Sequence, residues 1–133
     1  MDQWLKKQWT TALRSGAFPQ GRNVLRSTEG YCCLGVLCEV LGYESVLEEV
    51  FNVQTDEYVE NVYTYCPAGT DALRAADEEE LFEGESALIM MRELTPSVLA
   101  SVGISDEDQC HLMAMNDSHL SFSHIARWID NNL

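Results

Sequence analysis

Cysteine and histidine are the residues of this chain whose chemistry could support catalysis or metal binding. The sequence holds five cysteines and three histidines. A thiol enzyme would pair one cysteine with one histidine that acts as its base. Cys110 and His111 are the most suitable pair, with the polar turn Asn116-Asp117 nearby in the chain. However, adjacent helical residues point about 100° apart, so these two side chains would not face each other on a helix.

Three further cysteines, Cys32, Cys33 and Cys38, lie in an apolar segment over residues 30–42. An apolar setting raises the pKa of a thiol and makes it a poor nucleophile, and free cysteine packs well as a small hydrophobic residue. Adjacent Cys32 and Cys33 do not suit a disulfide framework, so reduced thiols in a cytoplasmic protein are expected. Paired Cys-x-x-Cys or His-x3-His spacings and phosphate-binding glycine motifs are absent, so the sequence predicts no metal site and no cofactor.

Acidic side chains are the other unusual feature. The chain has 22 Asp and Glu residues against 8 Lys and Arg residues, and its net charge is −14. Fifteen of the acids lie in residues 39–93, where only Arg74 and Arg92 oppose them. A field of this sign repels nucleic acid and anionic membranes and attracts basic protein surfaces. We therefore expect a basic protein partner and no direct binding to nucleic acid or membrane.

Two interpretations of this acidity are open. The simpler one is that the charge keeps the protein in solution. The sharper one is that carboxylates on one face imitate the phosphates of a nucleic acid and occupy the basic groove of a nuclease, a restriction enzyme or an RNA-guided effector. DNA carries one charge per roughly 1.7 Å of axis, so many acids must share that face. The acids expected to make these contacts are Glu48, Glu49, Asp56, Glu57, Glu60, Asp77, Glu78, Glu79, Glu80, Glu83 and Glu85.

The elements that must position these residues are expected to form one domain over residues 1–133. The apolar segment 30–42 predicts a central helix, in which Gly35 lets another element approach the backbone closely. No apolar run reaches the length of about eighteen residues that a membrane span needs. The N-terminus also lacks the apolar run of a signal peptide.

Amphipathic helices are expected at both ends of the chain. One covers residues 2–15, with both Trp4 and Trp9 on its inner face. Later helices begin at the caps Thr95, Ser105 and Ser121. The helix after Ser105 is predicted to turn inward Cys110, Leu112, Met113 and Met115.

The middle third favours strands. Residues 46–53 suit a helix or a strand, residues 55–65 favour a strand, and a hairpin is expected around residues 54–57. The apolar run 87–91 predicts a buried strand. The fold class predicted is therefore α+β: a helix-rich single domain with a small antiparallel sheet in the middle third.

Three stretches carry a resemblance to a known group of proteins. They are Trp9–Gly16, Gly30–Glu39, and Asn116-Asp117-Ser118 followed by Ser121–Ile129. In this order they resemble a family of small proteins of tailed bacteriophages, for which we know a source and no activity. The acidic middle, 43–93, lies outside the resemblance. In that pattern glycine usually follows Asn-Asp-Ser, and His119 in its place argues against a tight turn with positive φ.

The resemblance implies a protein that acts in the cytoplasm of an infected host cell. Together with the charge, it favours a non-enzymatic phage accessory protein that binds and inhibits a basic, nucleic-acid-handling host or defence protein. One alternative is a small thiol- or ligand-dependent enzyme that uses Cys110, His111 and the Asn116-Asp117 turn. Another is a scaffold or assembly subunit with no chemistry.

Overall fold

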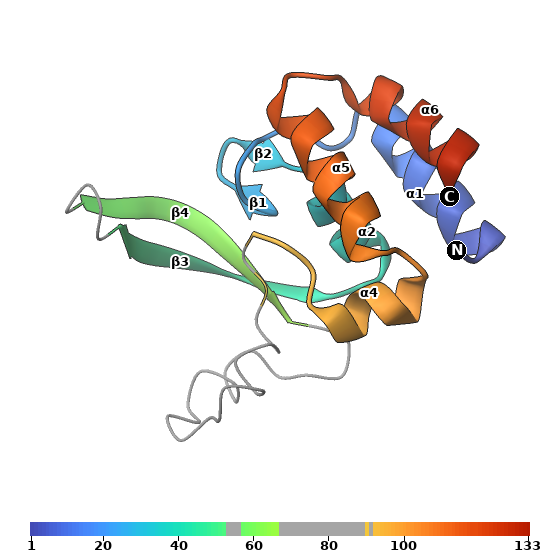
Figure 1. Cartoon of the computed structure of the whole chain (residues 1–133). Helices are drawn as coiled ribbons and strands as arrows, with labels where there is room; N and C mark the ends of the chain where they lie inside the picture. The colour runs from blue at the N-terminus through green and yellow to red at the C-terminus, as the bar shows by residue number, and fades with distance from the viewer. Residues whose placement is uncertain (53–56, 67–89, 91) are drawn as a thin grey trace.

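The protein combines a group of helices with one small antiparallel sheet (Figure 1). The computed structural model describes residues 1–52, 57–66, 90 and 92–133, and within these ranges it has five helices and four strands. The elements follow one another as α1 (Gln3–Arg14), β1 (Arg26–Ser27), β2 (Gly30–Tyr31), α2 (Cys33–Val40), β3 (Glu44–Asn52), β4 (Glu57–Cys66), α4 (Pro96–Val102), α5 (Asp106–Asp117) and α6 (Phe122–Asn132). The predicted helix-rich α+β fold is confirmed.

Side-chain caps fix where most of the helices begin. In each case the cap oxygen accepts a hydrogen bond from the backbone N–H three residues later, and the caps are Asp2, Thr95, Ser105 and Ser121. Such a bond satisfies one of the free donors of the first helical turn and is worth about 1 kcal/mol. The three caps predicted from the sequence are confirmed, and Pro96 occupies the first helical turn as its fixed φ favours.

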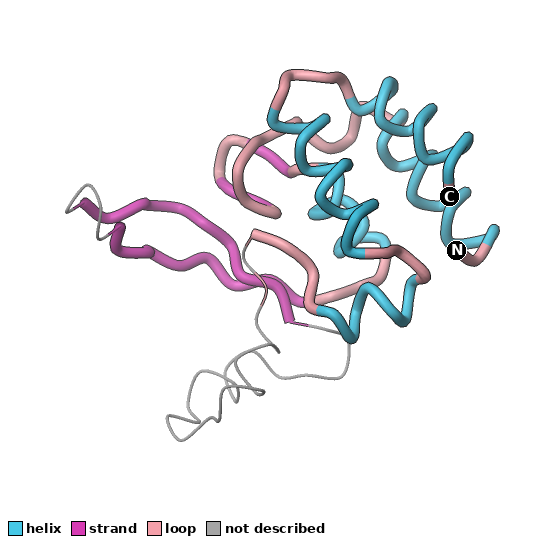
Figure 2. The backbone as a smooth tube through the Cα atoms, in the orientation of Figure 1, coloured by secondary structure: helices cyan, strands magenta, loops and turns pink. Residues whose placement is uncertain are grey.

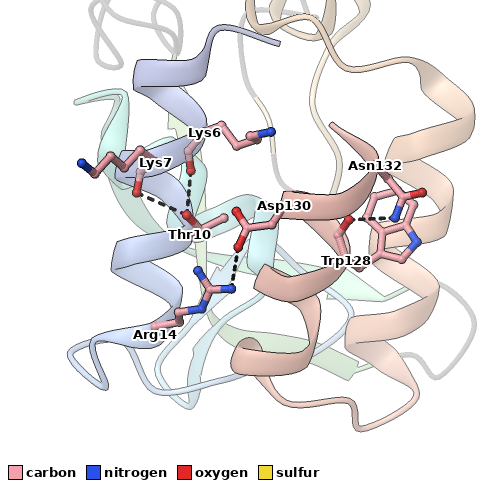
Figure 3. Close-up of polar contacts among 7 residues, drawn as sticks. All are labelled: Lys6, Lys7, Thr10, Arg14, Trp128, Asp130 and Asn132. Carbon is pink, nitrogen blue, oxygen red and sulfur yellow. Dashed lines mark hydrogen bonds and ion pairs between the residues drawn. The ribbon is translucent and has the colours of Figure 1, made fainter.

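The two terminal helices, α1 and α6, pack side by side, and α1 also packs against α2. Across the first contact, Arg14 Nη2 donates to Asp130 Oδ2 at 2.6 Å (Figure 3). Both side chains are exposed, so this pair contributes at most about 1 kcal/mol. The packing therefore depends mainly on the buried apolar side chains Trp9, Leu13, Ile125, Ala126 and Ile129.

The two tryptophans of α1 have different environments. Trp9 is completely buried, and its indole Nε1 donates to the carbonyl oxygen of Cys33 at 2.9 Å. Trp4, which was predicted to share the inner face, is 70% exposed, so that prediction is wrong. Five residues rotate a side chain by about 140° around a helix axis, which is too far for both rings to reach one core.

The central helix α2 lies in the core but is shorter than predicted. It begins at Cys33, because Tyr31 is held in β2: its N–H donates to Pro19 and its carbonyl accepts from Gly21. Every residue from Cys33 to Cys38 is buried. At Gly35 a Cβ atom would lie 1.8 Å from the carbonyl oxygen of Leu25. The predicted close approach at Gly35 is therefore confirmed.

The sheet has the strand order β2-β1-β4-β3, and β3 and β4 pair as the two strands of the predicted hairpin, whose turn at residues 53–56 lies outside the described residues. Their antiparallel register runs from Glu44 opposite Cys66 to Asn52 opposite Glu57, with a shift between Glu48 and Val50. Figure 2 shows this long hairpin beside the helices. The sheet is not confined to the middle third, because β1 and β2 extend it. Of the predicted strand 87–91, Met90 pairs with Tyr65, and residues 87–89 and 91 lie outside the described residues.

Candidate functional site

The β3–β4 hairpin carries four of the predicted contact acids and extends away from the helices (Figure 1). Glu48 and Glu49 belong to β3, and Glu57 and Glu60 belong to β4. The other seven predicted contacts lie outside the described residues: Asp56, Asp77, Glu78, Glu79, Glu80, Glu83 and Glu85. The described part of the chain thus gathers four of the predicted acids on one projecting element.

A polar and aromatic cluster around Arg26 fixes the base of this hairpin. The guanidinium carbon of Arg26 lies 3.9 Å from the ring centroid of Tyr63 and 4.8 Å from that of Tyr31. Arg26 Nη1 donates to Ser45 Oγ at 3.0 Å and lies 4.0 Å from Glu39 Oε2. A guanidinium over aromatic faces gains about 0.5–1 kcal/mol at exposed sites and more where water is excluded. The contacts tie β1 to β3, to β4 and to α2.

Glu39, the only charged residue of the apolar segment 30–42, completes the cluster. The hydroxyl group of Tyr65 donates to Glu39 Oε2 at 2.8 Å. Burial of Tyr65, together with this hydrogen bond and the charge of Glu39, raises the pKa of the phenol well above its usual value. Tyr65 therefore stays a neutral donor. Because these charged and polar groups hold one another, the cluster positions the hairpin.

Sequence reasoning missed the Arg26 cluster. The available signal was the spacing of Tyr63 and Tyr65, which places both rings on one face of a strand. A second signal was a single glutamate, Glu39, in an otherwise apolar helix, because a partly buried charge needs a partner. The sequence did not show how β1 pairs with β4, and this pairing brings Arg26 close to Tyr63 and Glu39.

Two ion pairs are formed among the side chains that the structure describes. Arg14 pairs with Asp130, and Arg26 pairs with Glu39. Neither pair uses one of the predicted contact acids. Two of the five cations in the first third of the chain are thus engaged by other carboxylates.

The residues of the alternative enzyme site do not come together. Cys110, predicted to face inward, is exposed, so that prediction is wrong. His111 is also exposed and stacks on Trp128, with ring centroids 5.0 Å apart. The inward positions of α5 include Gln109 and Leu112, and Gln109 Oε1 accepts from the backbone N–H of Leu94 at 2.7 Å. A buried polar residue pairs with backbone here, which an apolar periodicity cannot reveal.

Asn116 is completely buried, whereas Cys110 on the same helix is exposed. Its Oδ1 accepts from Gln20 Nε2 at 3.1 Å and from the backbone N–H of Cys33 at 3.3 Å. Its Nδ2 donates to the carbonyl of Gly21 at 2.8 Å. The amide therefore joins the start of α2, the loop before β1 and the end of α5. These bonds give Asn116 a structural role.

The turn after Asn116 differs from the sequence-based prediction. His119 has φ 71°, so the tight left-handed turn is present without glycine. The N–H of Leu120 donates to the carbonyl of Met115, and the N–H of His119 donates to that of Asn116. These two bonds are those of a Schellman motif, in which the residue at C′ must take positive φ. The need to satisfy the last carbonyls of α5 outweighs the conformational cost at His119.

Burial keeps the thiols of Cys32, Cys33 and Cys38 in their protonated form, as the apolar setting predicts. Burial raises the pKa of Cys32 to about 11, and it raises the pKa values of Cys33 and Cys38 well above their usual range. In Cys32 the bond from the N–H of Gly35 to its sulfur opposes this effect, but burial dominates. These thiols remain protonated at neutral pH and pack as small apolar groups.

The residues that the structure describes hold neither a metal-binding cluster nor a membrane-spanning helix. No group of three or more His, Cys, Asp or Glu side chains there is placed to hold a metal ion. In the same ranges, every helix is too short or too polar to cross a lipid bilayer.

A family model described as a domain of unknown function, DUF8296, matches the chain over residues 1–133. The chain belongs to the DUF8296 family. No curated protein and no solved structure matches it. Membership in the DUF8296 family supplies no activity, so the function must be argued from charge and geometry.

Proposed function

We propose that this protein is a non-enzymatic accessory protein of a tailed bacteriophage, which binds and inhibits a basic host or defence protein that handles nucleic acid. The observation that carries the proposal is the concentration of charge in residues 39–93, which hold fifteen acids against two arginines. Carboxylates in this number can replace the phosphates that a basic groove normally binds. The protein would act in the cytoplasm of the infected cell.

The described geometry supports the proposal in two ways. The hairpin that bears Glu48, Glu49, Glu57 and Glu60 extends away from the helices, where a large partner can reach it (Figure 1). Two of the described cations, Arg14 and Arg26, are paired with Asp130 and Glu39, which are not predicted contacts. The alternative enzyme site gains no such support, because Cys110 is exposed and Asn116 is buried.

The test is capture of the partner from infected host lysate, followed by measurement of its affinity at increasing salt. Binding carried by surface charge weakens steeply with ionic strength. The variant Glu78→Lys, Glu79→Lys, Glu80→Lys should abolish binding and leave the far-UV circular dichroism unchanged. The captured partner should lose its activity on nucleic acid when the wild-type protein is added.

A matched control keeps the net charge of the variant and moves the substitutions elsewhere. Glu29, Glu93 and Glu107 are exposed and are not predicted contacts, so their reversal to lysine changes the net charge equally. This control should retain most of the binding. Affinity that survives both high salt and the Glu78–Glu80 reversals contradicts the proposal.

A further inference from the structure

Among the strands that the structure describes, β3 lies at one edge of the sheet. Its neighbour β4 pairs with β3 on one side and with β1 and Met90 on the other. In the part of the chain that the structure describes, β3 has β4 as its only strand partner. An edge strand presents a row of backbone donors and acceptors that another extended chain can use.

The register identifies which backbone groups of β3 point outward. Tyr65 and Met90 exchange both backbone hydrogen bonds, at 2.7 and 2.8 Å, so Tyr65 directs its N–H and C=O away from β3. Ser45, which lies opposite Tyr65, is therefore in a non-hydrogen-bonded pair. Because the pattern alternates along an antiparallel ladder, the same holds for Leu47 opposite Tyr63. The N–H and C=O groups of Ser45 and Leu47 thus point away from β4.

The first residues of β3 are held in place by hydrogen bonds, and their exposed side chains include one acidic and one apolar group. The N–H of Tyr43 donates to the carbonyl of Cys38, and Arg26 holds the hydroxyl group of Ser45. Leu47 is 48% exposed on one face of the strand, and Glu44 is exposed on the other. Natural edge strands are commonly protected by lysine or proline, and β3 contains neither. Its three glutamates disfavour pairing with a second copy, because like charges would meet.

We propose that the outer edge of β3, over residues 44–48, binds an extended basic segment of the partner by strand addition. Ser45 and Leu47 would exchange four backbone hydrogen bonds with the segment. Alternating basic and apolar residues would suit this edge, since one face would meet Glu44 and the other Leu47. This inference rests on the proposed function, which supplies the positive charge of the partner. It adds that the partner is held by backbone hydrogen bonds to β3.

The test uses three synthetic peptides with the intact protein. The first is a seven-residue peptide of alternating lysine and valine, acetylated and amidated at its ends. The second has the same sequence, but its valines carry N-methyl groups that remove their backbone donors. The third carries the N-methyl groups on the backbone nitrogens of its lysines instead, and it covers the register in which the lysine N–H groups face β3. We expect one methylated peptide to bind at least tenfold more weakly than the unmodified peptide.

Amide hydrogen exchange locates the bound peptide. The amides of Ser45 and Leu47 should exchange at least tenfold more slowly when the unmodified peptide is present. The amide of Val46, which faces β4, serves as the internal control and should change little. Equal affinity for all three peptides, unchanged exchange at Ser45 and Leu47, or no binding at all would overturn strand addition.

A pair of variants gives a second readout. Leu47→Pro removes an outward N–H from an edge strand, where proline is tolerated, and should weaken the unmodified peptide at least tenfold. Leu47→Ile retains both the N–H and an apolar side chain of the same size that suits a strand, and should bind within about threefold of the wild type. If the Glu78–Glu80 reversals abolish capture of the natural partner but Leu47→Pro has no effect, the proposed function survives and strand addition falls. If no basic partner is captured, the proposed function itself fails.

Discussion

The surroundings of α2 and the β3–β4 hairpin differ in how closely they are packed against the rest of the molecule. Around α2 the contacts are short and complete: Gly35 touches the backbone of Leu25, Trp9 bonds to Cys33, and Asn116 joins three segments. The base of the hairpin joins this body through the Arg26 cluster and through the pairing of β4 with β1 and Met90, and the rest of the hairpin extends away from it (Figure 1). The difference indicates that the helical body determines the fold and that the hairpin is attached to it at its base.

The largest expected effect comes from closing the contact at Gly35. Gly35→Ala places a Cβ atom 1.8 Å from the carbonyl oxygen of Leu25, so α2 or β1 must move. We expect a loss of about 3 kcal/mol or more in the free energy of unfolding, measured by urea denaturation. In the hairpin, Leu47→Ala should cost less than about 1 kcal/mol, because Leu47 is half exposed. Comparable losses for the two variants would remove the contrast between body and hairpin.

The next effect comes from the buried amide of Asn116. Asn116→Ala removes the acceptor for Gln20 and for the N–H of Cys33 and leaves the carbonyl of Gly21 without its donor. Because unpaired buried groups cost about 1–3 kcal/mol each, we expect a loss of about 3 kcal/mol in chemical denaturation. The control, Asn132→Ala, is exposed on α6 and should stay within about 0.5 kcal/mol. An Asn116 variant as stable as this control would show that water replaces the network.

Arg26→Lys tests whether the hairpin is held separately from the body. Lysine keeps the charge but loses the planar group that lies over Tyr31 and Tyr63, so we expect a loss of about 1 kcal/mol. The amides of β3 and β4 should exchange faster while those of α2 remain protected. Equal acceleration in α2 would mean that hairpin and body unfold as one unit.

The smallest effect concerns His119. His119→Gly relieves the positive φ of 71° at the end of α5 and should stabilise the protein by about 0.5 kcal/mol. Ser118→Gly is the control, because Ser118 has negative φ and gains nothing from glycine. Thermal denaturation of both variants measures the difference. If both substitutions destabilise, His119 makes a contact that outweighs its backbone cost.

Features that depend on a few neighbouring residues could be predicted from the sequence. Thr95, Ser105 and Ser121 cap helices because a short polar side chain reaches an N–H only three residues away. Gly35 was recognisable because a glycine in an apolar helix needs a packing reason. The hairpin followed from β-favouring residues on both sides of a polar turn.

Features that depend on residues far away in the chain could not be predicted from the sequence. Trp4 and Trp9 are alike in type, and only the position of α6 and α2 decides that Trp9 is buried. Gln109 is buried because the backbone of Leu94 lies beside it. In the candidate site, the number of acidic residues could be read from the sequence. The way the hairpin projects could not, because it depends on the pairing register of β3 and β4 and on the contacts of Arg26. The sequence therefore predicted the charge of the site and missed its attachment.

The most direct test of the central claim is the affinity of the captured partner as a function of sodium chloride concentration. Wild-type protein and the Glu78→Lys, Glu79→Lys, Glu80→Lys variant would be compared, with the Glu29, Glu93 and Glu107 reversals as the charge-matched control. The account predicts steep weakening with salt for the wild type, no binding by the first variant and near wild-type binding by the control. Salt-independent binding, retained by the Glu78–Glu80 variant, would contradict it.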